Sequence, residues 1–428
     1  MDLLVVGAGP TGLAVMKALN EAGISFVGTE AHEEVGGNWH HGVYPSAAII
    51  SSRRTTEFPD DPMPASWPDF PSAAQMAAYY KGFADRHDLR RHIRFRSEVA
   101  SVRPDGDAWT VTWNEGASER FRGVLVANGH HWDRRWPSWI DAFRGERLHS
   151  KDYKQRSQLD GRRVLVIGAG NSGCDLVCES SRFGASVDWS IRRGVHILPK
   201  SIGGRPTVEW MSPWLPVPVQ RALMAMVLRI TVGPLERLGL PTPAQRLFET
   251  HPTVSSDVLH QLEHGRIRVR PDVASVEGTT VTFADGQVGT YDLVVCATGF
   301  HVSFPFLPAG LVPVDGPVAR LVGGMVRPDA RHLWVLATGQ ARYGIGPLLR
   351  PMAQLLAEWI GLQDELSVPL GRVLMQAGVR VSDTHLVDPH QVLRDVRRGR
   401  RATPWLRRLA ARHGWVGAPG PVLQPLVA

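Results

Sequence analysis

Two glycine-rich loops, each directly after an apolar segment, constrain the fold of this chain more than any other feature. Gly7-Ala8-Gly9-Pro10-Thr11-Gly12 follows residues 3–6, and Gly168-Ala169-Gly170-Asn171-Ser172-Gly173 follows residues 163–167. With this spacing the first glycine permits a tight turn, the second lets the backbone approach a pyrophosphate, and the third lets a helix pack closely on the strand. The free N–H groups at the start of that helix face the phosphates. The chain is therefore predicted to bind two dinucleotides.

The residues that follow each loop indicate which dinucleotide it binds. Glu30 stands 18 residues after Gly12, where a carboxylate can accept hydrogen bonds from both ribose hydroxyls. After the second loop the chain instead carries Arg192 and Arg193. A guanidinium is always charged and makes paired hydrogen bonds to phosphate oxygens, so it matches a 2′-phosphate. Asp188 lies inside the expected strand and is less well placed to contact the ribose. The second loop is predicted to bind NADPH rather than NADH.

Both loops lie in a strand–helix–strand pattern. The expected elements are strands at 2–6 and 24–29 around a helix at 10–22, and strands at 163–167 and 185–191 around a helix at 171–182. The chain is predicted to be an α/β protein with two Rossmann-like dinucleotide-binding domains, the second inserted into the first. The expected boundaries are 1–155 for the first part of the first domain, 156–290 for the second domain with a Pro- and Trp-rich insert at about 199–250, 291–390 for the return, and 391–428 for a basic tail.

The positive charge of the chain is concentrated at its end. Residues 391–428 contain eight arginines and one acidic residue, so they account for the whole net charge of +7. A solvated basic helix is the first interpretation, and contact with an acidic surface, a membrane or a nucleic acid is the alternative. Nothing in the rest of the sequence supports nucleic-acid binding, so we predict no nucleic-acid partner.

Cysteine content and hydropathy indicate a cytoplasmic protein. The three cysteines, Cys174, Cys178 and Cys296, show no disulfide-framework spacing, which is typical of a reducing compartment. The start of the chain predicts no secretory leader. The apolar segment at 217–232 is interrupted by charged residues and is too short to span a bilayer. We expect it to form an amphipathic helix over a substrate entrance, with peripheral contact to a membrane surface as the alternative.

A third motif lies between the loops. The residues Phe143, Gly145, His149 and Tyr153 resemble the FxGxxxHxxx(Y/F) fingerprint of the flavin-containing monooxygenases. Related Baeyer–Villiger monooxygenases carry Trp at the last position, so Tyr153 favours the former. Further segments that are similar to the family are Gly36-Gly37-Asn38-Trp39, Asn171-Ser172-Gly173, His251-Pro252-Thr253 and Ala297-Thr298-Gly299-Phe300. The resemblance covers roughly residues 1–350.

The resemblance implies a reaction and its cofactors. In the family, NADPH reduces FAD, and the reduced flavin reacts with O2 to give a C4a-(hydro)peroxyflavin. One oxygen atom then passes to a nitrogen or sulfur centre of a small organic molecule. No protein nucleophile or metal is required, so we predict no metal site. The family also implies that His149 belongs mainly to a structural linker between the two nucleotide domains.

The expected cofactor-binding residues come from these motifs. For FAD they are Gly7, Gly9, Pro10, Thr11, Gly12, Glu30, Gly37, Asn38 and Trp39, with Gln340 at the flavin edge. For NADPH they are Gly168, Gly170, Asn171, Ser172, Gly173, Arg192 and Arg193. Val99, Thr298 and Gly299 are further expected cofactor contacts, the last two where the chain is expected to return to the FAD domain.

One position departs from the family pattern. Family members commonly place an Asn over the flavin soon after the GGxW segment, and an ungapped alignment puts Ile50 there. Isoleucine cannot form that hydrogen bond, so Ser51 or Ser52 is the expected catalytic substitute, or else the chemistry differs. The alternatives left open are a Baeyer–Villiger monooxygenase acting on a ketone, an NADPH oxidase that releases hydrogen peroxide, and a non-catalytic NADP(H) sensor. The expected partners are a small-molecule substrate and O2, and the expected state is a monomer or a homodimer.

Overall fold

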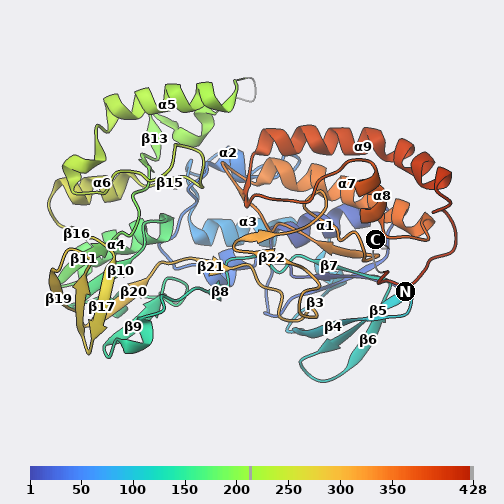
Figure 1. The fold of residues 1–428 in the computed structure, drawn as a ribbon, viewed down its shortest axis with the longest axis horizontal. Helices are drawn as coiled ribbons and strands as arrows, with labels where there is room; N and C mark the ends of the chain where they lie inside the picture. The colour runs from blue at the N-terminus through green and yellow to red at the C-terminus, as the bar shows by residue number, and fades with distance from the viewer. Residues whose placement is uncertain (212–214, 425–428) are drawn as a thin grey trace.

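The computed structural model describes residues 1–211 and 215–424, and its core is built on two parallel sheets that lie side by side (Figure 1). The first sheet has the strand order β24-β7-β1-β2-β3. Its strands are β1 (Leu3–Val6), β2 (Phe26–Thr29), β3 (Ile93–Arg94), β7 (Gly123–Val126) and β24 (Leu333–Val335). Helix α1 (Pro10–Glu21) connects β1 to β2 and packs against α7 (Gly346–Glu365). All four residues of β1 are buried, as expected for a central strand of a parallel sheet covered on both faces.

The second sheet has the strand order β16-β11-β10-β20-β9. Its strands are β9 (Glu146–His149), β10 (Arg163–Ile167), β11 (Ser186–Ser190), β16 (Arg268–Arg270) and β20 (Leu293–Cys296). Helix α4 (Asn171–Phe183) connects β10 to β11, and α6 (Ser256–Glu263) packs against α4. The prediction of an α/β fold with two Rossmann-like units is confirmed.

The structure moves two of the expected domain boundaries. Strand β20 pairs in parallel with both β10 and β9, so residues 293–296 and 146–149 belong to the second sheet. The return expected at 291 is therefore slightly too early: the chain rejoins the core of the first domain from Val302, and the first sheet gains its last strand at β24, which pairs with β7. The boundary at 155 is too late, because β9 already pairs in the second sheet from Glu146. The sequence shows that these segments are buried strands, but it does not show which sheet they join.

The insert of the second domain forms a separate group of short elements (Figure 1). They are β12 (Ile197–Leu198), β13 (Ser201–Ile202), β14 (Arg205–Pro206), α5 (Val217–Thr231) and β15 (Thr253–Val254). Each domain also carries a three-stranded antiparallel sheet. These sheets are β4 (Val99–Asp105), β5 (Ala108–Trp113) and β6 (Ser118–Phe121), and β17 (Val273–Glu277), β18 (Thr280–Phe283) and β19 (Val288–Thr290).

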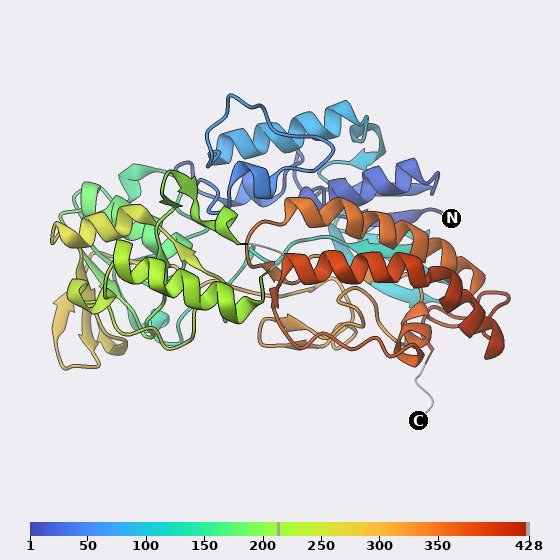
Figure 2. The ribbon, with the colours of Figure 1, turned by 90° about the horizontal axis from the view of Figure 1, so that it is seen from above.

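The expected basic tail is mostly a long helix, α9 (Pro389–Arg412), which packs along α7 (Figure 2). Ion pairs fasten it there, since Arg400 Nη2 lies 2.7 Å from Glu358 and Arg407 Nη2 lies 2.6 Å from Glu365. One face of α9 is thus part of the fold, and the other is solvated. Across residues 1–211 and 215–424, no helix combines the length and the apolar character needed to cross a membrane.

Candidate cofactor-binding and active site

The first glycine loop is closed to side chains and open to an anion. Gly7 has a φ of +100°, and a Cβ there would lie 2.7 Å from the carbonyl oxygen of Ala127. A Cβ at Gly12 would come closer than 3.0 Å to the carbonyl oxygen of Gly7. Helix α1 starts at Pro10, and among the described residues no side chain caps its N-terminus. The N–H groups of its first turn are therefore left for a ligand with acceptor oxygens.

The segments predicted to surround this loop lie against it. The Glu30 carboxylate is buried and accepts hydrogen bonds from the backbone N–H groups of Ala8 (2.9 Å) and His32 (3.2 Å). Gly37 has a φ of +54°, and a Cβ there would lie 3.0 Å from the Cα of Gly9. Only a residue without a side chain permits this approach. The carboxylate and the GGxW segment are thus brought to the loop as an FAD site requires.

Asn38 and Trp39 begin the short helix Asn38–Gly42, which follows Gly37 directly. Trp39 packs against the apolar cores of both domains, so it lies at their junction. Val99 is buried at the start of β4, two residues after Ser97, whose N–H donates to the carbonyl of Glu30 (2.9 Å). Its side chain packs in the core with Leu4, which leaves its backbone as the part that can face a cofactor.

The second loop repeats the geometry of the first. Gly168 has a φ of +104°, and a Cβ there would lie 2.5 Å from the carbonyl oxygen of Ala297. A Cβ at Gly173 would come closer than 3.0 Å to the carbonyl oxygen of Gly168, whereas one at Gly170 would meet no described atom within 4 Å. Helix α4 starts after Gly170 with no side-chain cap from the described part of the chain. This cradle also fits a pyrophosphate.

Asn171 differs from its expected role. Its side-chain amide donates to the carbonyl of Pro252 (3.2 Å) and accepts from the N–H of Val254 (2.8 Å). The Thr253 hydroxyl donates to the carbonyl of Ala169 (3.1 Å). The side chain of Asn171 thus fixes the His251-Pro252-Thr253 segment beside the loop, and its backbone N–H is the group left for a phosphate.

The charged residues of β11 and of the segment after it differ in burial: the one inside the strand is buried, and the two after it are exposed. Asp188 is fully buried and is held by Arg268 (2.6 Å), Arg270 (2.6 Å) and the Tyr291 hydroxyl (2.8 Å). It is therefore committed to the core of the domain. Arg192 and Arg193 are exposed at the end of this strand, and neither makes an ion pair within the described ranges. Both guanidinium groups are thus open to solvent, and their contact with a 2′-phosphate stays a prediction.

The fingerprint between the loops includes strand β9, which pairs with β20 in the second sheet. Its histidine contacts the segment that follows β20. His149 is buried; its Nε2 donates to the carbonyl of Gly299 (3.1 Å), while its Nδ1 accepts from the N–H of Lys151 (3.2 Å). Burial lowers the pKa of His149, which keeps the ring neutral. The carbonyl of Thr298 accepts from the guanidinium of Arg135 (2.8 Å). These contacts fit a structural linker.

Thr298 and Gly299 lie beside the second loop rather than the first. Ala297 contacts Gly168 in the same way that Ala127 contacts Gly7. The chain rejoins the first domain just after this motif, since Val302 packs in the core of that domain and the carbonyl of Phe306 accepts from the N–H of Val102 (2.7 Å). A cofactor contact of Thr298 and Gly299 is therefore expected with the second dinucleotide.

Comparison with known proteins agrees with this geometry. The family described as "Flavin-binding monooxygenase-like" matches residues 2–337. The chain belongs to this family. Flavin-containing monooxygenase 5 of Homo sapiens is 33% identical over 348 residues, which are 74% of this chain and 65% of the human protein. The chain thus spans slightly less than two thirds of that relative.

Two further relatives extend the comparison. Dimethylaniline monooxygenase [N-oxide-forming] 2 of Mus musculus is 30% identical over 390 residues, covering 83% of this chain and 72% of the mouse protein. The crystal structure of OTEMO in complex with FAD and NADP has a TM-score of 0.68 at 19% identity, covering 85% of this chain and 84% of that one. The likeness to OTEMO shows the shared fold of two dinucleotide-binding domains.

Both serines proposed as catalytic substitutes have partners inside their own loop. Ser52 caps the short helix α2 (Arg53–Thr56), where its hydroxyl accepts from the N–H of Thr55 (3.3 Å). The Ser51 hydroxyl is hydrogen-bonded to that of Thr56 (2.7 Å). This geometry does not favour either serine as a catalytic group. The neighbouring Ile50 packs against the apolar cluster of the insert.

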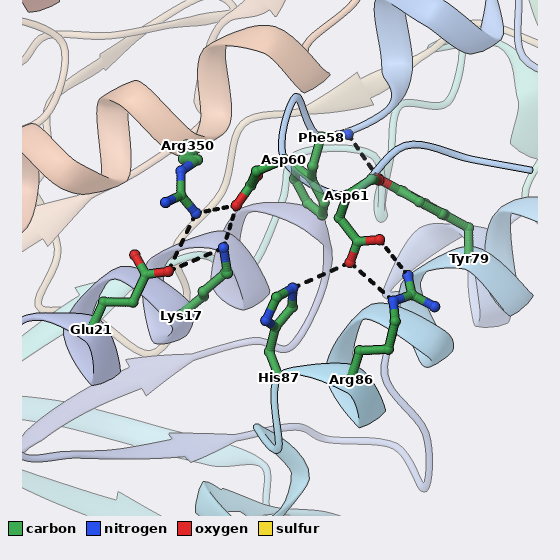
Figure 3. A network of polar contacts seen from close by, with 9 residues as sticks. All are labelled: Lys17, Glu21, Phe58, Asp60, Asp61, Tyr79, Arg86, His87 and Arg350. Atoms are coloured by element: carbon green, nitrogen blue, oxygen red, sulfur yellow. Dashed lines mark hydrogen bonds and ion pairs between the residues drawn. The ribbon is translucent and has the colours of Figure 1, made fainter.

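A polar network fixes the segment that follows this loop (Figure 3). Asp60 is paired with Lys17 of α1 and Arg350 of α7. Asp61 accepts from Arg86 (2.8 Å) on α3 (Ala73–Arg86). In addition, the Tyr79 hydroxyl accepts from the N–H of Phe58 and donates to the carbonyl of Asp61, both at 2.7 Å. The segment that contains Phe58, Asp60 and Asp61 is thus held to helices α1, α3 and α7 of the first domain.

The structure also reveals a group of histidines at the domain junction. His130 donates to the carbonyl of Ala337 (2.9 Å), and its ring centroid lies 4.2 Å from that of His131 and 5.4 Å from that of His385. Burial lowers the pKa of His130 and of His251 to about 4. In the described part of the chain, one buried ring nitrogen of each of His130, His251 and His385 has no hydrogen-bond partner. The sequence shows only the adjacent pair, because the other two come from distant segments.

These histidines predict a pH dependence of stability. Their folded pKa of about 4 lies below the unfolded value of roughly 6.5, so the unfolded state binds more protons between these values. Stability is complete above about pH 6.5 and falls as the pH drops toward 4. We expect the melting temperature to fall between pH 7 and pH 5, and less steeply in the double variant His130→Asn/His251→Asn. Differential scanning fluorimetry measures this, and parallel curves for the two proteins would contradict it.

A cavity of about 850 Å³ adjoins the first glycine loop. It reaches Thr11 at the start of α1 and Gly339 and Ala341 on either side of Gln340, and it extends beneath α9. The N–H of Gln340 donates to the carbonyl of His385 (2.8 Å), which joins β25 (Gln340–Ala341) to β26 (Leu386–Val387). Most of the lining side chains are apolar. The cavity is large enough for a drug-sized organic molecule.

One group of ligand-type side chains lies apart from these features. One atom each of His32, Glu33 and His41 lie within 4.8 Å of one another at the surface, in the part of the chain that the structure describes. His32 and Glu33 are neighbours in the sequence, but His41 comes from the helix Asn38–Gly42, so the sequence does not show this arrangement. His41 Nε2 also lies 3.1 Å from the carbonyl oxygen of Glu34. That the chemistry requires no metal stays a prediction.

Proposed function

We propose that this protein is an FAD- and NADPH-dependent monooxygenase that oxygenates a nitrogen or sulfur centre of an apolar organic molecule. The proposal rests mainly on two glycine loops, each at the start of a helix that follows a parallel strand. The buried carboxylate of Glu30 lies against the first loop, and Arg192 and Arg193 follow the second strand of the other domain. When bound, the flavin would supply the redox and oxygen chemistry, with NADPH as the electron source.

The protein's own residues supply binding, orientation and exclusion of water. The N-termini of α1 and α4 would hold the two pyrophosphates. Glu30 would accept from the ribose of FAD, and the two arginines would bind the 2′-phosphate of NADPH. The apolar cavity beside Thr11 would exclude water and admit a neutral amine or sulfide more readily than a charged metabolite. We also propose a cytoplasmic location, which the three buried free cysteines support.

The second candidate function is an NADPH oxidase that releases hydrogen peroxide, and Ile50 favours it. Its side chain packs on an apolar cluster and offers no hydrogen bond to the flavin site. Oxygenation of a ketone is a third outcome. A single assay separates the three functions: the flavin-loaded protein is incubated with NADPH, O2 and N,N-dimethylaniline, thioanisole or cyclohexanone. We expect one N-oxide or sulfoxide per NADPH. One peroxide per NADPH would establish the oxidase, and a lactone the ketone reaction. A protein that takes up no flavin when FAD is added, and that consumes no NADPH, would be the sensor.

The arginines after β11 give a test of cofactor choice. Loss of a charge-assisted hydrogen bond costs about 1.5–3 kcal/mol, or roughly tenfold to a hundredfold in affinity. We expect Arg192→Ala and Arg193→Ala to raise the KM for NADPH by about this factor and to leave the KM for NADH almost unchanged. Steady-state kinetics with both nucleotides measure the effect, and Arg144→Ala, an exposed arginine outside this region, is the control. Equal increases for both nucleotides would reject the 2′-phosphate assignment.

The departure at Ile50 gives a test of coupling. An amide at this position restores a hydrogen-bonding group, so Ile50→Asn should lower the ratio of peroxide released to NADPH consumed, roughly twofold or more for one hydrogen bond of about 0.5–1.5 kcal/mol. Ile50→Val is the control, since it changes volume without adding a polar group. An unchanged ratio in Ile50→Asn would show that this side chain does not face the flavin.

A further inference from the structure

Helix α5 presents an apolar face to solvent. Its buried residues are Gln220 and Met224. Four apolar residues, Val219, Leu223, Met226 and Ile230, recur every three or four positions and are all exposed, with Met226 at 57% and Ile230 at 78%. Residues with this spacing lie on one side of a helix. The helix contains no acidic residue. An uncovered apolar face of this kind marks an interaction surface.

Helix α9 presents a basic face. Val396, Leu406 and Ala410 are buried on the side that packs on the protein. Arginines on the opposite side recur with the same helical spacing, and Trp405, 48% exposed, lies among them. These outward arginines are Arg394, Arg397, Arg401, Arg408 and Arg412. Within the described residues none of the five lies within ion-pair distance of a carboxylate.

The two helices lie on the same side of the molecule. Both run along the upper edge in Figure 1, and both face the viewer, almost in line, when the molecule is seen from above in Figure 2. An apolar helix face and a basic helix face with a central tryptophan therefore lie on one side of the molecule. We call this side the α5–α9 face.

We propose that the α5–α9 face docks on an anionic lipid bilayer. Apolar side chains of an interfacial helix enter the boundary between headgroups and acyl chains, and arginines contact lipid phosphates while tryptophan lies at that boundary. A nucleic acid would match the arginines of α9 but not the apolar stripe of α5. A second protein chain would match the stripe but leave five arginines unpaired. The bilayer is the partner that matches both halves.

The test is flotation of the full-length, flavin-loaded protein with vesicles of phosphatidylcholine, alone or mixed with phosphatidylglycerol. We expect binding to the mixed vesicles that weakens as salt is added, because salt screens the arginines. Arg397→Gln/Arg401→Gln should raise the lipid concentration needed for half-maximal binding by roughly tenfold to a hundredfold, since each basic residue contributes about a factor of five. Met226→Gln/Ile230→Gln should weaken binding to a similar extent.

The control variant is Arg103→Gln/Arg144→Gln. It removes two exposed arginines, one on β4 and one just before β9, and both of these strands lie along the lower edge in Figure 1. This variant should bind vesicles like the parent protein. Flavin content and circular dichroism show whether each variant is folded. Absence of vesicle binding, or equal loss in the control, would overturn the proposal. Retention of a DNA duplex without vesicle binding would assign the face to nucleic acid, and a dimer that Met226→Gln/Ile230→Gln dissociates would assign it to a second copy.

Discussion

Gly12→Ala should purify largely without flavin, whereas Gly173→Ala should retain its flavin and lose reduction by NADPH. In each case the new Cβ would come closer than 3.0 Å to a backbone carbonyl oxygen, that of Gly7 or that of Gly168. A backbone atom cannot rotate away as a side chain can, so the loop must open and its N–H groups must turn from the phosphates. Overpacking of this kind costs about 1–3 kcal/mol, which corresponds to binding that is weaker by roughly fivefold to a little over a hundredfold.

The measurement combines flavin absorbance per protein with the rate of anaerobic flavin reduction at several NADPH concentrations. Gly361→Ala, in the exposed part of α7, is the control, because a Cβ there meets no described atom within 4 Å. It should behave like the parent protein and be slightly more stable, since alanine favours a helix over glycine by about 1 kcal/mol. If Gly12→Ala keeps its flavin, or if both variants lose the same function, the assignment of one cofactor to each loop is wrong.

Features that depend on neighbouring residues could be predicted from the sequence. The glycine loops depend on three positions within six residues, and in both loops the structure leaves no room for a side chain at the first and third glycines. Glu30 and the two arginines could be predicted because a helix and a strand of similar combined length separate them from their loops. The fingerprint at 143–153 indicated the family to which the chain belongs.

Features that depend on strand pairing could not be predicted. Strand β7 and the segment after it lie beside β1, and strand β20 and the segment after it lie beside β10. The carbonyl of Ala127 closes on Gly7, and the carbonyl of Ala297 closes on Gly168. In both domains the carbonyl oxygen of an alanine after a parallel strand thus lies against the first glycine of the loop. The sequence pattern alone does not show to which domain each of these two segments belongs. This equivalence explains why residues 293–296, which pair in the second sheet, are predicted to belong to the first domain.

Side-chain partners were likewise beyond the sequence pattern. Ser52 is a predicted catalytic substitute because it lies two residues after the aligned position of Ile50, but in the structure it caps a helix. His130, His251 and His385 are separated by more than 100 residues from one another and meet only because the domains pack together. Such groups depend on tertiary contacts that no periodicity encodes.

Asp188→Ala should destabilise the second domain by about 3–5 kcal/mol. The carboxylate is buried between Arg268 and Arg270, and the side chain of Arg270 is only 10% exposed. Removal of the carboxylate leaves a buried guanidinium without its counter-charge, which is the costly way to break such a pair. The next residue, Trp189, is fully buried and donates its indole N–H to the carbonyl of Gly168 (2.9 Å). Disturbance of β11 should therefore reach the second loop and weaken NADPH binding as well.

Urea unfolding followed by tryptophan fluorescence measures the loss, and NADPH titration measures its effect on the loop. Asp292→Ala is the matched control: it removes an acid from the same sheet that pairs with Arg163 at 2.6 Å but is exposed, so water screens the pair and the loss should be small. Asp188→Asn keeps the hydrogen-bonding group without the charge and should fall between the two. If Asp188→Ala is no less stable than Asp292→Ala, the buried carboxylate does not hold β11 and β16 together, and the arginines must find water or another acid.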